Sequence, residues 1–403
     1  MKNNRSLLCR PEGGTGRRVA RETSTAPGRF PSPADSSRYS FCRRAVIISS
    51  ALLALIGIVT VFIAVSTSTL TASQGMSKVY IQAGAAALGI AAMVLISRMP
   101  MSFLYRRLWW LFIGLTLGIL GVTLVYGSGP YGTKSWLTVP GTGLSVQTSE
   151  FVKVMFIVAF AGHVRALGDR IESPIGFVSL LLHFGAVCGL VILQHDLGSA
   201  LVYIFIALMI CFSSGLGMRY FLFGGLGLAV ASPLLWHFLS DYQKARISVG
   251  MNPESDPLGY GYQVILSRSA VIAGYPFGSP PLKLEYSPLL PASHTDMAFA
   301  VLSEQFGIIG AAVLFGGYLV LVFALLSLGR RSDRTGAAVC AGVAAIIICQ
   351  SVENIGMCLG IMPVVGITLP FVSYGGSSVL ALFLSLGVAL GVAKPASGGP
   401  SAD

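Results

Sequence analysis

The stretch Ala45–Ser66, AVIISSALLALIGIVTVFIAVS, decides the fold of this chain. It contains no charged residue. As a helix rising about 1.5 Å per residue, it is long enough to cross the roughly 30 Å hydrocarbon core of a bilayer. It also lacks the polar–apolar alternation of a barrel strand, so a helix is the only spanning structure open to it. The stretch therefore predicts a transmembrane helix.

Similar apolar runs recur to the end of the chain. The whole sequence is 54% hydrophobic and 11% charged, whereas a soluble domain is about 25% charged. Most of the surface must therefore face lipid, and the sequence predicts an all-α polytopic membrane protein with about ten transmembrane helices. The runs lie at 45–66, 79–97, 108–126, 149–165, 175–193, 197–215, 220–239, 297–328, 336–358 and 369–393.

Residues 1–44 form a basic tail, with ten Lys or Arg and three Asp or Glu set among Gly, Ser, Thr and Pro. Such a segment has little apolar surface to bury and is expected to be disordered. A nucleic-acid-binding arm is an alternative, but the adjoining membrane helix favours a cytoplasmic tail beside anionic lipid. The alternate loops are also basic, so both termini are expected in the cytoplasm. The predicted transmembrane domain covers 45–395, and a short cytoplasmic tail covers 396–403.

The seven cysteines form no CxxC pair and do not lie beside clustered histidines. We interpret them as small buried apolar residues, with no disulfide framework and no metal centre assigned. The sequence requires no cofactor, although it leaves open a divalent cation such as Mg²⁺ or Mn²⁺.

One connection is much longer than the others. Residues 240–296 join the seventh and eighth helices on the predicted outer side, and loops of such length are usually functional. The loop ends in His294-Thr295-Asp296, and Glu304 follows about two helical turns later. An Asp at a helix N-terminus is most often a cap, but a carboxylate beside a His at the bilayer edge is also well placed to act as a general base.

Charged residues within the apolar runs are costly and need a partner or a function. Glu150 and Lys153 share one helical face. They form either a self-neutralising pair or part of a polar cavity in which Lys153 faces an anionic ligand. In Gln194-His195-Asp196, the Asp is expected to cap the following helix.

Several motifs in a fixed order resemble the SEDS family (shape, elongation, division and sporulation), which includes FtsW, RodA and SpoVE. The segment Gln147–Lys153 resembles the family's QPSE-x-x-K, and Gln194–Ser199 resembles its QPDLGT. His294-Thr295-Asp296 matches its HTD segment. The run Asn354–Ser378 matches its NIGM…LPF-S-YGGSS segment. The resemblance covers about residues 45–395.

This resemblance implies a ten-helix fold with a large extracytoplasmic loop before the eighth helix. It also implies a peptidoglycan glycosyltransferase that polymerises lipid II at the outer face of the bacterial cytoplasmic membrane. The expected partner is a class B penicillin-binding protein, and nucleic acid is not expected as a partner. Asp296 is the implied catalytic residue, and cations able to hold pyrophosphate are Lys153, Arg246, Lys134 and Lys283. The supporting residues are Glu150, Gln194, Asp196, His294, Glu285, Glu304, Ser373 and Tyr374.

The sequence also departs from the family pattern, at Ser135, Thr148, His195 and Ala292. The stretch Lys283–Tyr286 favours the division and sporulation branch, so we predict an FtsW-like role with the division machinery at the septum, and a RodA-like elongation role is the alternative. A lipid II flippase and a scaffold that only recruits the transpeptidase are two further alternatives.

Overall fold

The computed structural model of the chain describes residues 33–68, 75–99, 101–129, 132–138, 141 and 145–393. Its helices are α1 (Pro33–Thr67), α2 (Gly75–Arg98), α3 (Ser102–Arg107), α4 (Trp109–Tyr126), α5 (Thr148–Leu167), α6 (Pro174–Leu193), α7 (Leu197–Ser213), α8 (Met218–Phe238), α9 (Asp241–Met251), α10 (Tyr262–Ala273), α11 (Ala298–Gly329), α12 (Arg334–Cys358) and α13 (Gly376–Val392). Short 3₁₀ segments are η2 (Gly168–Glu172), η3 (Pro253–Ser255) and η4 (Ser287–Leu289). The strands β1 (Trp136–Thr138) and β2 (Ser145–Gln147) pair antiparallel.

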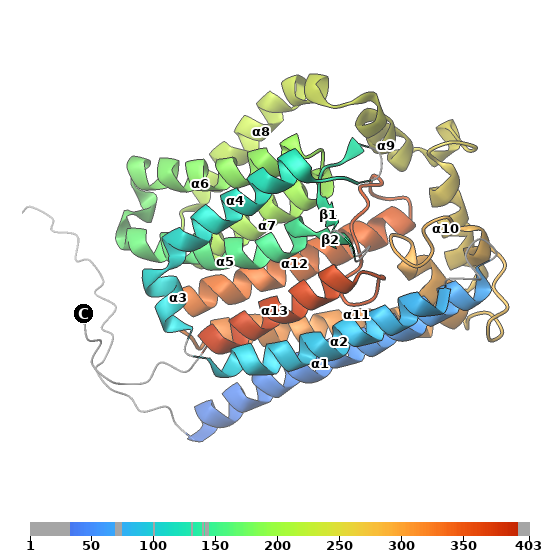
Figure 1. Cartoon of the computed structure of the whole chain (residues 1–403), viewed down its shortest axis with the longest axis horizontal. Coiled ribbons are helices and arrows are strands. Elements are labelled where there is room, and N and C mark those ends of the chain that lie inside the picture. The colour runs from blue at the N-terminus through green and yellow to red at the C-terminus, as the bar shows by residue number, and fades with distance from the viewer. Residues whose placement is uncertain are drawn as a thin grey trace, which may run out of the picture.

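The predicted bundle of apolar helices is confirmed. Within the described residues, seven helices are long and apolar enough to cross a membrane, and α7, α13 and the Met218–Leu234 part of α8 are shorter apolar stretches. Figure 1 shows most of the long helices running roughly side by side, with α9 and α10 gathered at one end. The fold is therefore that of a multi-pass membrane protein.

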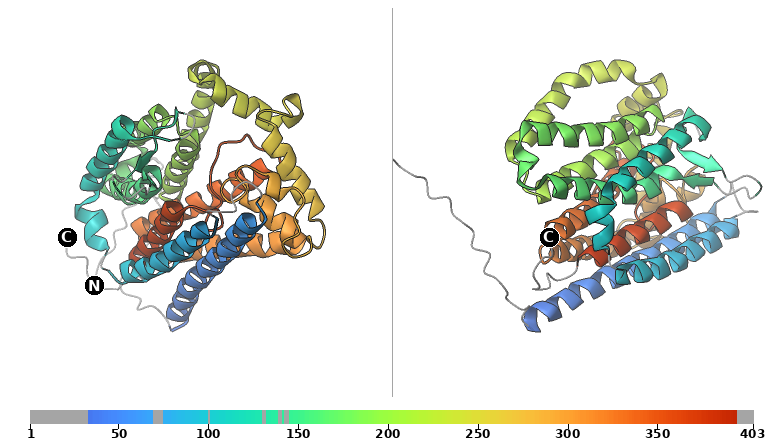
Figure 2. Two further views of the ribbon diagram at one scale, coloured as in Figure 1. Left: turned by 45° about the vertical axis from the view of Figure 1, so that its right-hand side comes forward. Right: turned by 60° about the vertical axis from the view of Figure 1, so that its left-hand side comes forward.

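Helix α12 forms the centre of the bundle. It packs against α5, α7, α10, α11 and α13, and most of its residues are buried inside the protein. Figure 2 shows α1 and α2 along one side and α8 at the opposite edge. No described residue of α8 is buried, so that helix offers its apolar side chains to lipid.

Polar caps set several of the helix boundaries. Ser173 accepts a hydrogen bond from Gly176 N at the start of α6, and Asp333 accepts one from Gly336 N at the start of α12. Ser240 and the side chain of Gln243 form a reciprocal capping box that begins α9. These short-range signals lie in the sequence, which is why most predicted boundaries fall within a few residues of the observed ones.

Two predicted boundaries differ from the structure. Helix α1 begins at Pro33, so residues 33–44 are helical rather than part of a disordered tail, while residues 1–32 and 396–403 lie outside the described part of the chain. The tenth run was expected over 369–393, but α13 begins only at Gly376. Residues 369–375 instead cross the end of the bundle, where Ser373 and Tyr374 hold the predicted catalytic segment.

The long connection is not a plain loop, since it contains α9, α10 and two 3₁₀ turns. It packs onto the first turns of α11, which are separated from the rest of that helix by a break at Gly307, where φ is 59° and ψ is −148°. A side chain there would meet the carbonyl oxygens of Pro276 and Gly274, so the break requires glycine. Ile308 N donates to Pro276 O at 3.0 Å across this break.

Candidate active site

Asp296 lies in a tight turn that leads into α11. Thr295 N and Met297 N both donate to Ala292 O at 3.1 Å, which closes the turn. The cap residue of α11 is Met297, and no side chain caps this helix. The interpretation of Asp296 as a helix cap is therefore wrong, and its half-buried carboxylate is available for another role.

A set of long-range hydrogen bonds holds the backbone around Asp296. Asn354 Nδ2, from α12, donates to Asp296 O and to Ile367 O, each at 2.8 Å, and Asn354 is fully buried. Ser373 Oγ donates to Thr295 O at 2.5 Å. The carbonyls of Thr295 and Asp296 are thereby tied to two different segments, so the carboxylate projects from a well-held backbone.

The carboxylate faces a guanidinium across Gly366. A Cβ atom placed on Gly366 would lie 3.1 Å from Arg246 Nη2 and 3.4 Å from Asp296 Oδ2. Burial raises the pKa of Asp296 above its ordinary value, and the nearby Arg246 partly opposes that rise. The sequence predicted both charged groups separately, and the structure brings them together from the long loop and the start of α11.

His294 has a supporting position beside the carboxylate. Its Nε2 lies 3.0 Å from Lys78 Nζ of α2, its ring lies 5.7 Å from the ring of Tyr374, and Tyr374 N donates to His294 O at 2.7 Å. Burial and the positive charge of Lys78 lower the pKa of His294 to about 4. The imidazole is therefore neutral near pH 7, so His294 orients the turn rather than supplying positive charge.

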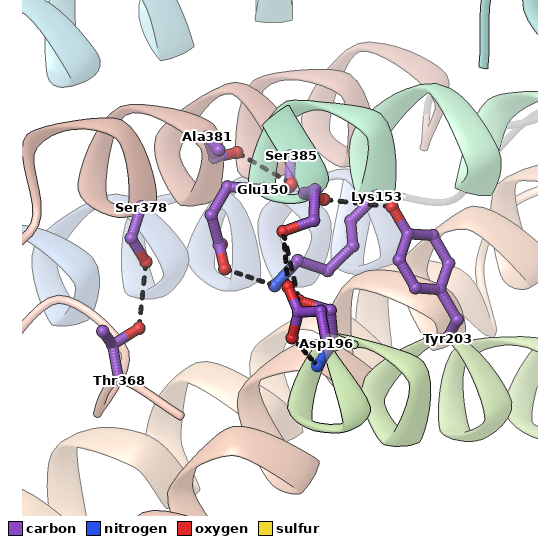
Figure 3. A network of polar contacts seen from close by, with 10 residues as sticks. Glu150, Lys153, Asp196, Tyr203, Thr368, Ser378, Ala381 and Ser385 are labelled. Carbon is purple, nitrogen blue, oxygen red and sulfur yellow. Dashed lines mark hydrogen bonds and ion pairs between the residues drawn. The ribbon is translucent and has the colours of Figure 1, made fainter. Parts of the chain in front are cut away.

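The second cluster lies on α5 and α7, where Figure 3 shows the side chains of Glu150, Lys153 and Asp196 pointing toward one another. Lys153 Nζ donates to Glu150 Oε1 at 2.7 Å, and both side chains are buried. Asp196 accepts hydrogen bonds from Ser199 N and Ser199 Oγ, both at 2.9 Å. The expected cap of α7 by Asp196 is confirmed, and so is the pairing of Glu150 with Lys153.

Gln194 supports this cluster from the turn before α7. It is fully buried, and its Nε2 donates to Leu120 O at 2.8 Å. The backbone carbonyl of Gln194 accepts a hydrogen bond from Lys134 N at 3.0 Å, which ties the segment before β1 to this turn.

The second cluster lines a small polar cavity, and Gly366 and Ile367 of that cavity adjoin the Asp296 cluster. Lys153 lines it, as the sequence suggested, and Gly366 connects it to the Asp296–Arg246 pair. Lysine has three N–H donors, so Lys153 can pair with Glu150 and still face a ligand. The cavity is lined by Gln147, Glu150, Lys153, Asp196, Gly198, Ser199, Val202, Gln350, Gly366, Ile367 and Thr368.

The other two predicted cations lie elsewhere. Lys134 and Lys283 are both exposed, and neither lines this cavity. Their role in holding pyrophosphate stays a prediction.

Glu304 is buried, and it fixes the long loop instead of facing the cavity. Its carboxylate accepts hydrogen bonds from the backbone N–H groups of Glu285, Tyr286 and Ser287 at 2.7, 2.9 and 2.8 Å, and from Ser287 Oγ. The adjacent Gln305 binds the backbone at Leu282 and Ser279. The exposed Glu285 thus contributes mainly through its backbone.

Local geometry explains how two of the departures from the family pattern are accommodated. Thr148 N donates to Ser135 O at 3.2 Å, a bond that proline cannot make, and Thr148 Oγ1 accepts from Thr123 Oγ1 at 3.0 Å. His195 is exposed with a φ of 61°, which a proline could not adopt. Neither departure disturbs the Asp196 cap of α7.

Sequence reasoning missed several residues of the site. Lys78, Gln82, Gln350 and Gly366 were not singled out, although Gly366 lies inside a quoted motif. Gln82 of α2 donates to Ser373 O at 3.1 Å and accepts from Gly375 N at 3.1 Å. These contacts join segments far apart in the chain, so no local pattern signals them.

The fold and the site together define a class: a polytopic membrane protein with a carboxylate–guanidinium pair at the rim of a polar cavity between its helices. The chain belongs to the FtsW, RodA and SpoVE family of cell cycle proteins, whose family model matches residues 43–397.

Individual relatives agree with this assignment. The chain is 36% identical to a probable peptidoglycan glycosyltransferase FtsW of Hydrogenovibrio crunogenus, over 76% of this chain and 79% of that protein. It is 32% identical to the peptidoglycan glycosyltransferase MrdB of Escherichia coli K12, over 77% and 84%.

Solved structures show the same fold. A chain from a peptidoglycan synthase complex, studied for the coordination of polymerization and crosslinking, matches with a TM-score of 0.73 and 30% identity over 86% of this chain and 96% of that one. The rod shape determining protein RodA of Thermus thermophilus matches with a TM-score of 0.64 and 27% identity over 86% and 95%.

Proposed function

We propose that this protein is a peptidoglycan glycosyltransferase that polymerises lipid II into glycan strands. The observation that carries the proposal is the position of the Asp296 carboxylate. It does not cap α11, and it faces Arg246 across Gly366 at the rim of the cavity that Lys153 lines. A base and two cations arranged in this way suit a transfer in which a hydroxyl loses a proton while a pyrophosphate leaves.

In the proposed reaction, the growing glycan on undecaprenyl pyrophosphate is the donor. The 4-hydroxyl of an incoming lipid II attacks the anomeric carbon with inversion, and Asp296 takes the hydroxyl proton. The new bond joins that oxygen to the anomeric carbon. The bond from this carbon to the pyrophosphate oxygen breaks, and the electron pair leaves with the pyrophosphate.

The cations act on the leaving group. Arg246 can hold phosphate oxygens bidentately. Lys153 adds a buried positive charge, and its attraction for the pyrophosphate becomes stronger as water is excluded. The raised pKa of Asp296 makes its carboxylate a stronger base than an ordinary aspartate, provided that the medium keeps it ionised.

The test is polymerisation of lipid II by the purified full chain with its transpeptidase partner. Asp296→Asn keeps the shape of the side chain but removes the base, so the rate should fall by about 10²–10⁴-fold. Asp241→Asn, at an exposed position in the first turn of α9, is the matched control and should keep the rate. A wild-type rate in Asp296→Asn would remove Asp296 from the role of base, and lipid II transport by Asp296→Ala vesicles would favour a flippase.

The membrane side of the cavity, the partner and the cellular role belong to the same proposal. We place the cavity at the outer face of the cytoplasmic membrane, with both termini inside, and we assign a class B penicillin-binding protein as the partner. The FtsW names among the relatives support a role in division at the septum, while the MrdB relative keeps the elongation role as the alternative. Depletion of the chain in cells distinguishes the two, because loss of a division enzyme gives filaments and loss of an elongation enzyme gives spheres.

The need for a cofactor is a separate prediction. The reaction needs no redox or prosthetic group, and a divalent cation such as Mg²⁺ or Mn²⁺ would act on the pyrophosphate oxygens. Polymerisation assayed with EDTA and then with each metal restored measures this dependence.

A further inference from the structure

A groove on the lipid-facing side of the protein shares no residue with the cavity at the candidate active site. It runs between α1 and α11 and has a volume of about 600 Å³. Its walls are apolar apart from Ser49 and one basic residue, Arg44. It is lined by Phe41, Arg44, Ala45, Ile48, Ser49, Leu52, Val313, Gly316, Gly317 and Val320.

Two adjacent glycines create the hollow. A Cβ atom on Gly316 would have nothing within 4 Å, so this position is open, whereas a Cβ on Gly317 would come 2.9 Å from Leu53. Gly317 thus lets α1 pack closely against α11, and Gly316 leaves the adjoining space unfilled. The groove is a product of these two positions and not of a gap between distant helices.

The groove has a basic end. Arg44 is exposed, its Nε donates to Ser40 O at 3.3 Å, and within the described residues it forms no ion pair. The neighbouring Arg43 is occupied differently, because its guanidinium donates to Ser97 Oγ of α2 at 3.0 Å. The terminal N–H groups of Arg44 are therefore available to an anion.

The length of the groove fits one leaflet. Helix α1 rises by about 17 Å from Phe41 to Leu52 at about 1.5 Å per residue, which is roughly half of a ~30 Å hydrocarbon core. A transmembrane helix would need a groove through both leaflets, whereas a single acyl chain spans one.

We propose that the α1–α11 groove binds an anionic phospholipid, with its phosphate on Arg44 and one acyl chain over Gly316. This site does not depend on the proposed enzymatic activity, since none of the cavity residues around Asp296 lines it. The binding follows from apolar contact along the groove and a charge-assisted hydrogen bond at its end.

The test measures lipid retained by the full chain. The protein is reconstituted in vesicles of equal parts phosphatidylglycerol and phosphatidylcholine, extracted in mild detergent and analysed by native mass spectrometry. The wild type should retain phosphatidylglycerol in preference to phosphatidylcholine. Arg44→Gln should lower that preference about tenfold, because one hydrogen bond to a charged group is lost. Gly316→Leu should fill the groove and abolish retention of both lipids.

Matched variants make the result decisive. Arg107→Gln changes an exposed arginine at the end of α3, and Gly185→Leu changes an exposed glycine of α6 that also has nothing within 4 Å. Both should behave as the wild type, and equal melting temperatures show that each variant is folded. Equal retention of the two lipids by the wild type, or unchanged retention in Gly316→Leu, would overturn the proposal. A chain that retains no lipid but dimerises through Gly316 would assign the groove to a helix instead.

Discussion

Replacing Asn354 by leucine removes the tie that fixes the backbone of the proposed base. Asn354 Nδ2 donates at 2.8 Å to both Asp296 O and Ile367 O and so links α12 to both segments, while Cys358 Sγ of the same helix is a weaker donor to Asp296 O at 3.7 Å. Leucine fills a similar space but donates nothing. The change therefore leaves two carbonyl groups without this donor while keeping the buried side chain apolar and compact.

The magnitude follows from those two bonds. A carbonyl left unsatisfied in the interior costs about 1–3 kcal/mol, so two carbonyls would lose about 2–6 kcal/mol. Asn354 Oδ1 is itself buried with no hydrogen-bond partner, and removing it returns about 1–3 kcal/mol of that loss. The net destabilisation is expected to be about 1–3 kcal/mol. The polymerisation rate should fall more steeply, since a misplacement of the base by about 1 Å can cost 10²-fold.

The assay combines thermal unfolding in detergent with lipid II polymerisation. Ser385→Ala is the control, because Ser385 is equally buried but donates only within its own helix, to Ala381 O at 2.8 Å. The control should keep the rate. If Asn354→Leu melts at the wild-type temperature and polymerises at the wild-type rate, the hydrogen bonds of Asn354 do not position Asp296 and the reasoning is refuted.

Three further predictions concern the same region. Gly366→Ala should lower the polymerisation rate about tenfold or more, because a φ of 79° costs an alanine about 1–2 kcal/mol and its Cβ would press on Arg246 and Asp296. Gly132→Ala is the control, since Gly132 has the same φ in open surroundings, and it should keep the rate. Glu304→Gln should weaken four charge-assisted hydrogen bonds, each worth about 1.5–3 kcal/mol, and limited proteolysis should cut the long loop faster. The pH–rate profile should lose activity on acidification at a pH above the ordinary 3.8 of aspartate, because burial raises the pKa of Asp296 and only the ionised form is a base; a rate that persists to pH 4 would contradict this assignment.

Much of the fold could be predicted because its signals are local. Each apolar run is a continuous stretch whose length matches a bilayer, and the caps at Asp196 and Asp333 adjoin the helices they begin. The start of the tenth helix was predicted seven residues too early, at 369 instead of Gly376, for a physical reason. Residues 369–375 are apolar because they are buried in protein, and Leu369 N bonds to Ser373 Oγ at 2.9 Å in a turn rather than in a helix.

The site was predictable only in part. Asp296, Lys153 and Arg246 were identified from charge in unusual places and from the family motifs. Their arrangement was not predictable, because it depends on Gly366 lying between two charged groups that are remote in sequence. The break at Gly307 was also missed, since a glycine within an apolar run looks the same whether the helix continues or stops there.

That break gives α11 two parts with different attachments. Beyond Gly307 the helix lies among other helices and lipid, while the turns from Ala298 to Phe306 are fastened to the long loop through Glu304 and Gln305. The turn that carries Asp296 thus leads directly into the part of α11 that holds the loop, and Gly307 separates that part from the longer membrane-spanning part. We therefore expect a change that releases the loop from Glu304 to disturb Asp296 more than a substitution of similar size beyond Gly307.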